Sequence, residues 1–409
     1  MYTRIRLFII VLFAASLTLA VGQEGNHGTQ QPEAAHSAPA EKKYDPVATV
    51  MHHIGNSNEF HIVGNWSIPL PCILYSKEDG FNFFMSNKFH HGSKAVDKYV
   101  LEHGVVRRIK GEFPQGEVEL EPIHHEGAEN EGEHHYSFKK EMDGKEVSFV
   151  KADGAEYELE RAATLMHNTS FYDFSISKNV FAMLLATFIL FFVFLKVARM
   201  SKERAGKAPK GIQSLIETVF IFIRDEVAKP MIGHQYERFL PLLMSLFFFI
   251  LVLNLLGLIP FFPGSANVTG NLATTMVLAI ITFIVTNING NKHYWGHVLW
   301  MPGLPLAIKP LISAIEIIGL FTKPFSLMMR LFANITAGHI IILSLVGLIF
   351  VFGNAGESIP GSIGGAAIAI PFTIFMNLIE LLVAFLQAYI FTMLAASYIG
   401  AAVEEPHHH

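Results

Sequence analysis

The sequence predicts an all-α polytopic membrane protein with five transmembrane helices, an interfacial helix and a long tilted C-terminal hairpin. A small β-rich external domain precedes the helices. The 409 residues are 51% hydrophobic and 16% charged, with 35 phenylalanines, which is typical of membrane proteins. Residues 23–175 carry 25 acidic and 14 basic residues, a net charge of −11, whereas residues 176–409 carry 10 and 14, a net charge of +4. Two different environments are therefore expected.

The first 22 residues have the pattern of a secretory signal peptide. Arg4 and Arg6 precede the apolar stretch LFIIVLFAASLTLA, and the small residues AVG precede Gln23. A short apolar core after a positive start, followed by small residues, is the pattern that signal peptidase recognises. The alternative is a first transmembrane anchor. With either interpretation, the segment that follows lies outside the cytoplasm.

Residues 23–49 predict a disordered linker, because most of them are small or polar. Residues 50–170 predict an external soluble domain of short strands, in which apolar runs are broken by Asp-Gly pairs. One of these pairs lies within EMDGKEV, a strong hairpin signal. Cys72 is the single cysteine, which excludes an internal disulfide and a C-x-x-C redox pair.

Four adjacent histidine pairs lie in the external part of the chain. They are His52–His53, His90–His91, His124–His125 and His134–His135. Metal binding or pH sensing is one interpretation, and a solvated polar surface is the other. Neighbouring residues of a strand point to opposite faces, so a pair is poorly arranged to chelate one ion. We therefore expect no metal site and no bound cofactor.

A membrane domain is predicted over residues 175–403. Residues 180–198 (VFAMLLATFILFFVFLKVA) are long and apolar enough to span a bilayer. The basic segment KVARMSKERAGKAPK follows, and the positive-inside rule places it in the cytoplasm. The preceding domain is then external, in agreement with the signal peptide.

Further apolar stretches define the remaining helices. Residues 211–233 predict an amphipathic interfacial helix, because charged residues interrupt the apolar ones. Membrane-crossing helices are predicted at residues 239–264, 271–288, 310–353 and 366–400. The stretch 310–353 is too long for a perpendicular crossing, so we expect it to be tilted or bent, with Pro324 as a candidate bend. The tail 404–409 is then cytoplasmic.

Polar residues recur inside the last two predicted helices. Arg330 and Asn334 are one turn apart on one face. If the two helices are antiparallel and Gln387 is level with Arg330, then His339 lies about 13 Å and Glu380 about 10 Å toward the outside. The acid and the imidazole thus reach nearly the same depth, and their pairing explains how each is tolerated.

These residue types favour proton translocation. Arginine keeps its proton under physiological conditions, so Arg330 is suited to attracting a carboxylate and barring direct proton passage. His339 and Glu380 can both take up and release protons. Glu316 lies four turns before Arg330, on the same face and nearer the cytoplasm. The alternative is an ion-pair network that only holds the helices together.

At these residues the sequence resembles subunit a of the F-type ATP synthase. The motif MRLFANITAGH and the stretch LIELLVAFLQAYIF carry the resemblance, which extends over residues 175–402. It implies that Arg330 faces the rotating ring of c subunits and that Gln387 is its polar neighbour. The long external extension has no counterpart in the short form of the family.

The resemblance also implies roles for the other polar residues. Asn334, His339 and Glu380 match an outer half-channel, and Glu316 matches an acid of an inner half-channel. Asn254, within LNLLGLIP, lies where the family often has a polar residue.

The implied function is that of a proton-channel stator subunit in a bacterial inner membrane, with a periplasmic N-terminal domain and a cytoplasmic C-terminus. Its implied partners are the c-ring, the peripheral-stalk b subunits and the lipid bilayer, without nucleic acid. The sequence lacks a G-x-x-x-x-G-K-[ST] phosphate loop, so no nucleotide is expected on this chain and it is not expected to be catalytic alone. The alternatives are a proton-coupled secondary transporter and a membrane-anchored metal or pH sensor.

Overall fold

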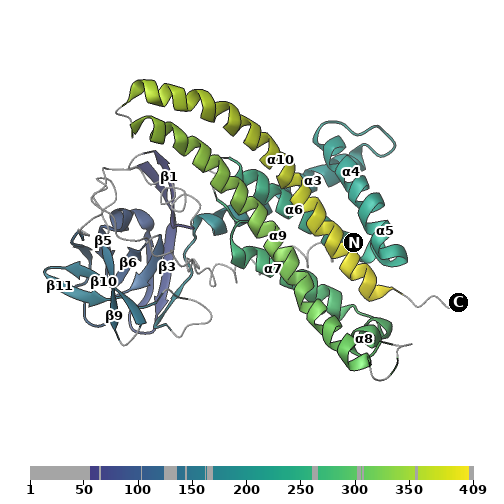
Figure 1. Cartoon of the computed structure of the whole chain (residues 1–409), viewed down its shortest axis with the longest axis horizontal. Helices are drawn as coiled ribbons and strands as arrows, with labels where there is room; N and C mark the ends of the chain where they lie inside the picture. Colours follow the sequence, from purple (N-terminus) through teal and green to yellow (C-terminus); the bar gives the residue numbers. More distant parts are fainter. Residues whose placement is uncertain are drawn as a thin grey trace.

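The computed structural model describes residues 56–63, 66–102, 104–123, 136–142, 145–161, 163, 169–259, 266–301, 305, 308–354 and 358–404. The predicted signal peptide 1–22, the linker 23–49, residues 405–409 of the tail and three of the four histidine pairs lie outside these residues. In the described part, a β-rich domain lies beside a body of long helices (Figure 1). This arrangement confirms the predicted combination of a strand-rich N-terminal region and a helical membrane part.

Twelve short strands form four antiparallel sheets in the described part of the β domain. The strands are β1 (Glu59–Val63), β2 (Trp66–Pro69), β3 (Pro71–Ser76), β4 (Gly80–Met85), β5 (Lys94–Val96), β6 (Tyr99–Glu102), β7 (Val105–Arg108), β8 (Glu117–Glu119), β9 (Ser137–Met142), β10 (Lys145–Ala152), β11 (Ala155–Glu158) and β12 (Phe171–Asp173). The sheet orders are β1-β2, β12-β3-β4, β7-β6-β5-β8 and β11-β10-β9. A 3-10 helix, η1 (Ser86–Gly92), follows β4.

The strands on either side of each Asp-Gly pair are antiparallel partners. Ser76 pairs with Gly80, Met142 with Lys145, and Ala152 with Ala155. Asp153 and Gly154 both have positive φ, 50° and 75°, as a two-residue turn matched to the strand twist requires. The turn chemistry therefore accounts for the pairing of β10 with β11, whereas Asp143 and Gly144 lie outside the described residues.

A buried arginine ties the turn after β3 to the end of β7. The side chain of Arg108 is 4% exposed. Its Nη2 donates to Asp79 Oδ2 at 2.5 Å and to Glu78 Oε2 at 2.7 Å, and its Nη1 donates to Ser170 Oγ at 2.5 Å. Burial alone would raise the pKa of Asp79, but the hydrogen bonds from Arg108 and Ser76 outweigh that effect and lower it.

The helical part follows β12 directly. Its elements are α3 (Lys178–Glu203), α4 (Ile212–Phe222), the π-helix η2 (Ile223–Ala228), α5 (Lys229–Ile232), η3 (Gly233–Gln235), α6 (Tyr236–Gly257), α7 (Leu272–Ile288), α8 (Lys292–Leu299), α9 (Lys309–Phe352) and α10 (Ile359–Val403). Among the described residues, four helical stretches are long and apolar enough to cross a membrane, and α7 with α8 brings the number to five if that bent pair counts as one crossing.

The predicted interfacial helix at 211–233 corresponds to α4, η2 and α5. These elements join α6 in one helical stretch, Ile212–Gly257, which is itself long and apolar enough to cross. The number of five crossings and the interfacial position of the first half of this stretch therefore stay predictions.

The last two helices form a hairpin (Figure 1). They contain 44 and 45 residues, which corresponds to about 66 Å each at 1.5 Å per residue. A bilayer core is only about 30 Å thick, so neither helix fits it in a perpendicular orientation. Helix α9 continues through Pro324 and does not end there.

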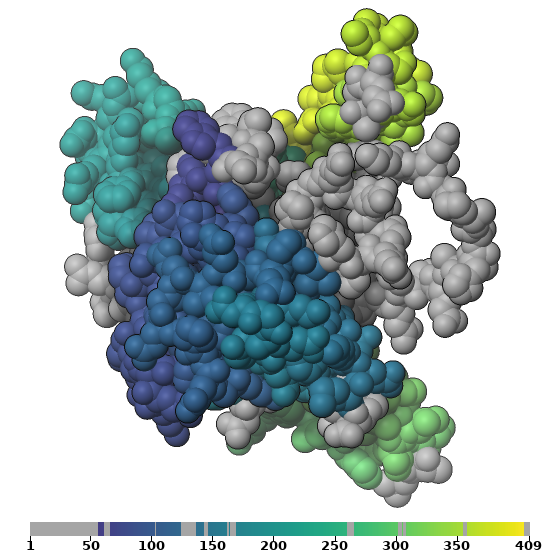
Figure 2. Space-filling model, turned by 90° about the vertical axis from the view of Figure 1, so that its left-hand side faces the viewer, coloured from purple at the N-terminus to yellow at the C-terminus, as the bar shows by residue number. Residues whose placement is uncertain are grey.

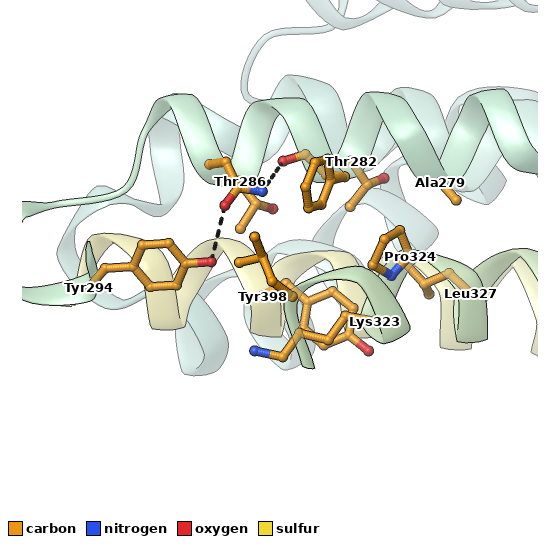
Figure 3. Close-up of a pocket in the computed structure, with 11 residues that line it drawn as sticks. Ala279, Thr282, Thr286, Tyr294, Lys323, Pro324, Leu327 and Tyr398 are labelled. Carbon is orange, nitrogen blue, oxygen red and sulfur yellow. Dashed lines mark hydrogen bonds between the residues drawn. The ribbon is translucent and has the colours of Figure 1, made fainter. Parts of the chain in front are cut away.

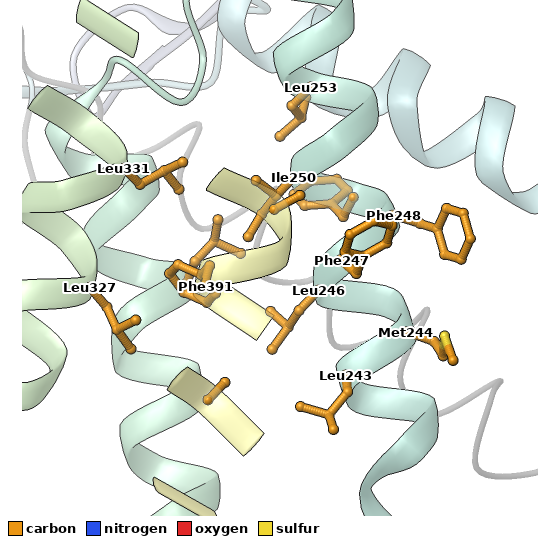
Figure 4. Packing of buried hydrophobic residues seen from close by; sticks show 14 of the residues in the cluster. Leu243, Met244, Leu246, Phe247, Phe248, Ile250, Leu253, Leu327, Leu331 and Phe391 are labelled. Atoms are coloured by element: carbon orange, nitrogen blue, oxygen red, sulfur yellow. The ribbon is translucent and has the colours of Figure 1, made fainter. Parts of the chain in front are cut away.

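An apolar core joins this hairpin to α6. Leu327 and Leu331 of α9, Phe391 of α10 and Ile250 of α6 point into it (Figure 4). Leu327, Leu331 and Ile335 recur every four residues and are buried, which fixes which face of α9 is turned inward.

The β domain is attached to the first turn of α3. The backbone N–H of Lys178 donates to Ser57 O at 2.9 Å, and that of Asn179 donates to Asn56 Oδ1 at 3.3 Å. The rings of Phe60 and Phe181 meet edge to face at 5.5 Å. Residues at the start of the β domain thus satisfy N–H groups that the first turn of a helix leaves without an intrahelical partner.

Cys72 provides a test of the packing of this domain. The residue has no exposed surface, and burial raises the pKa of its thiol to about 12. Because the thiolate is the reactive form, we expect no detectable maleimide labelling of native protein between pH 7 and 9. Complete labelling is expected after unfolding in denaturant. Fast labelling of the native protein at pH 8 would contradict the buried position.

Candidate functional site

A histidine and a glutamate meet between α9 and α10. His339 Nδ1 lies 3.6 Å from Glu380 Oε1, so the predicted pairing of the two side chains is confirmed. Glu380 is 4% exposed, and neither of its carboxyl oxygens has a hydrogen-bond partner among the described residues. A buried carboxylate with so few partners is costly in free energy, so the charge of His339 has a direct effect on it.

Gly338 makes room for the carboxyl group. A Cβ atom at this position would stand 2.7 Å from Glu380 Oε1 and 3.0 Å from Cδ, and a real Cβ does not approach other atoms so closely. The close contact between the two helices here depends on the absence of a side chain. The residue next to His339 in sequence thereby determines where Glu380 lies.

The other ring nitrogen of His339 faces the end of α6. A Cβ atom built on Gly257 would lie 3.7 Å from His339 Nε2. Nearby on α6, Asn254 Nδ2 donates to Ala384 O at 3.0 Å, and Thr269 Oγ1 donates to Asn254 Oδ1 at 2.7 Å. Asn254 thus links α6 to α10 one turn beyond Glu380.

Arg330 and Asn334 lie on a different face of α9. Both are exposed, whereas Leu331 and Ile335, the residues that follow each of them, are buried in the core. Neither polar side chain makes an ion pair or a hydrogen bond with a described residue. The predicted shared face of Arg330 and Asn334 is therefore observed, and no described residue forms a hydrogen bond or ion pair with it.

Gln387 and Glu316 make no hydrogen bond or ion pair with Arg330, His339 or Glu380 among the described residues. Gln387 is buried on α10, and the described part of the chain shows no hydrogen bond between it and Arg330. Glu316 is half-buried near the start of α9, 14 residues before Arg330, which corresponds to about 21 Å along the helix. The structure thus brings His339 and Glu380 together and adds Asn254 through the α10 backbone. The roles predicted for Arg330, Asn334, Gln387 and Glu316 stay predictions.

Sequence reasoning did not find a small cavity between α7, α8, α9 and α10 (Figure 3). Tyr294 donates from its hydroxyl group to Asn287 Oδ1 at 3.3 Å, and Lys323 Nζ lies 5.9 Å from the centre of the Tyr398 ring. The polar lining residues are Thr282, Thr286, Asn287, Tyr294, Lys323 and Tyr398. The spacing of Thr282 and Thr286, one helical turn, was the available sequence signal.

The histidine pairs give no metal site in the part of the chain that is described. No group of three or more His, Cys, Asp and Glu side chains in that part is arranged to hold an ion. The one described pair is His90–His91, and His91 Nδ1 lies 2.9 Å from Glu59 Oε1. His91 therefore contacts a carboxylate of β1, and the other three pairs remain untested.

Comparison with known proteins gives two family matches. Residues 180–400 match the family described as ATP synthase A chain. Residues 49–129 match a family described as a domain of unknown function. The first match covers nearly all of the α3–α10 region, from the first turn of α3 to the last turn of α10. The second match covers the first part of the β domain, through β8.

Individual relatives agree with the first match. The chain is 46% identical over 244 residues to ATP synthase subunit a 2 of Chlorobaculum tepidum. The aligned region covers 58% of this chain and 66% of that protein, just under two thirds of its length. The chain is 45% identical over 241 residues to ATP synthase subunit a of Chloroherpeton thalassium, covering 58% and 69%. It is 40% identical over 251 residues to ATP synthase subunit a of Myxococcus xanthus, covering 58% and 76%.

The family match covers more than half of the chain and includes the His339–Glu380 pair, Gly338 and the exposed Arg330. This chain therefore belongs to the ATP synthase A chain family, the family of ATP synthase subunit a.

Proposed function

We propose that this protein is the proton-channel stator subunit of an F-type ATP synthase. It provides two offset half-channels that load and unload carboxyl groups on a rotating c-ring, and so couples proton flow to ATP synthesis. The names of the relatives support the assignment to ATP synthase. The observation that carries the mechanism is the contact of His339 with the buried Glu380. It lies on the same hairpin as an exposed Arg330 that has no ion-pair partner among the described residues.

The outer half-channel runs past Asn334, His339 and Glu380. Histidine and glutamate both exchange protons in water, and here they lie within 3.6 Å of each other between helices. Asn254 holds α6 against α10 beside them. A proton that arrives from the outside passes along this pair to a ring carboxyl group.

Arg330 separates the two half-channels. Its positive charge is permanent and makes no ion pair with another described residue. It therefore attracts a ring carboxylate and repels a proton that would cross directly. Gln387 is its polar neighbour on α10, and Glu316 marks the inner half-channel through which the proton leaves toward the cytoplasm.

The proposed setting is a bacterial inner membrane. The β domain lies on the periplasmic side and the end of α10 on the cytoplasmic side, because the basic segment after α3 favours the cytoplasm. The partners are the c-ring, the peripheral-stalk b subunits and lipid. ATP chemistry takes place on other subunits, so this chain is not catalytic alone.

Two other functions are less well supported. A proton-coupled secondary transporter would use the same buried pair, but the family match favours the synthase. A metal or pH sensor in the external domain would depend on histidine pairs that lie mainly outside the described residues. Metal binding by the detergent-solubilised whole chain, measured by calorimetry, tests that alternative.

The Arg330→Ala variant tests the charge barrier. We expect ATP-driven acidification of inverted membrane vesicles to fall by about tenfold or more, since a charge interaction in a dry site is worth several kcal/mol. The matched control is Lys207→Ala, which removes a positive charge from the exposed segment after α3 and leaves acidification unchanged. Both variants are compared at equal subunit assembly. Normal pumping by Arg330→Ala would remove this residue from the mechanism.

The Gly338→Ala variant tests the position of Glu380. The new Cβ would displace the carboxyl group from His339, so we expect proton pumping to fall several-fold while the complex still assembles. Gly364→Ala is the matched control, because a Cβ on Gly364 of α10 meets no atom within 4 Å.

A compensating change sharpens this test. In the Gly338→Ala background, Glu380→Asp shortens the acid and relieves part of the clash, so we expect partial recovery of pumping. If Gly338→Ala pumps as well as Gly364→Ala, the proposed role of the close contact is wrong.

A further inference from the structure

One face of the sheet β12-β3-β4 carries large aromatic side chains that nothing in the described chain covers. Along β3 and β4, alternate residues are buried, among them Cys72, Leu74 and Phe84. The residues between them form the opposite face. We call this face the aromatic face, and its residues are Ile73, Tyr75, Phe81, Phe83, Tyr172 and Phe174.

The strand register builds this face. Tyr75 pairs with Phe81 on one side and with Tyr172 on the other, so three rings form a row across the sheet. Their ring centres lie 4.6 Å and 6.3 Å apart. Phe81 and Phe83 are 76% and 70% exposed. An ordered aromatic row open to solvent on a small domain marks an interaction surface.

The aromatic face begins where the chain enters the membrane. Phe174 stands four residues before Lys178, the first residue of α3, which corresponds to at most about 14 Å of extended chain. Phe60 of β1 contacts Phe181, inside the apolar stretch of α3. The β domain is therefore seated at the level of the outer membrane surface.

The orientation of the sheet agrees with this position. In Figure 1, β3 lies between β6 and the long helices. The inner face of β3 packs toward β6, where Leu74 and Cys72 share a core with Tyr99 and Val106. The aromatic face is therefore turned to the side of the helices. In Figure 2, which views the molecule from the left-hand side of Figure 1, the β domain lies in front of the helices.

A further aromatic residue, Trp66, lies on the side of the β domain that contacts α3. Phe60 pairs with Ile68 in the β1–β2 hairpin, and Trp66 lies two residues from Ile68 on the same strand. Residues two apart share a face of a strand, so Trp66 lies on the face that contacts α3. It is 75% exposed.

We propose that the aromatic face, together with Trp66, binds the outer surface of the lipid bilayer at the boundary between headgroups and acyl chains. Tyrosine and tryptophan concentrate at this boundary because their rings are apolar and their polar atoms reach water. The β domain is then a bilayer-bound element that fixes the start of α3 relative to the membrane. This role does not depend on the proton path.

The test uses the whole complex in nanodiscs of phosphatidylethanolamine and phosphatidylglycerol. An environment-sensitive fluorophore is attached to Phe83→Cys, while the buried native Cys72 stays unlabelled. The matched control is Ala155→Cys on β11, an exposed position on the strand that lies farthest from the helices in Figure 1. Quenching by lipids that carry a nitroxide near the headgroup is measured for both. Because both positions are exposed, neither change disturbs the core.

The proposal predicts a blue-shifted emission at position 83 and quenching several-fold stronger than at position 155. Equal quenching at the two positions overturns it. A blue shift at 83 without lipid quenching also overturns it, because that result means that another protein covers the face. Trp66 gives a label-free check in a Trp295→Phe, Trp300→Phe background, in which the same lipids should quench the remaining fluorescence.

Discussion

The hairpin of α9 and α10 is organised around one buried carboxyl group. Glu380 lies between the helices, has no hydrogen-bond partner among the described residues, and has His339 at 3.6 Å. A buried carboxylate is tolerated only next to a compensating group. Gly338 allows the two helices to approach closely enough for this contact, and Asn254 holds α6 against α10 one turn further along. The chemistry proposed for the subunit depends on that geometry.

The fold places the acidic and the basic side chain of the hairpin in different surroundings. Glu380 is turned inward and has a partner, whereas Arg330 is turned outward and, within the described chain, has none. The buried row of Leu327, Leu331 and Ile335 decides this, because packing that row into the core leaves the other side of α9 open. An arginine on a membrane-facing surface is expensive unless a partner supplies a negative charge, which is why we place a ring carboxylate opposite it.

The external domain and the membrane part are joined by short-range contacts at one place. Backbone hydrogen bonds cap the start of α3 with residues from the beginning of the β domain, and Phe60 packs on Phe181. The strand β12 then leads into α3 within a few residues. This short connection supports the proposal that the aromatic face contacts the bilayer, because the headgroup boundary suits aromatic rings better than water does.

The sequence alone determined the class of protein, the Asp153–Gly154 turn and the pairing of His339 with Glu380. Long apolar stretches can be stable only as helices in lipid, and Asp-Gly pairs favour tight hairpins because they tolerate positive φ. Both are local properties. The similar depth of His339 and Glu380 along the two helices also followed from counting residues, because an α-helix rises by the same distance with each residue. Only the tertiary structure decided that Gly338 leaves room for the carboxyl group and that Asn254 donates to the backbone of α10. It also decided that a small cavity lies between α7 and α10, and that three strands turn their rings outward. These features depend on which surfaces meet, and residues 130 positions apart, such as Asn254 and Ala384, carry no local signal of that meeting.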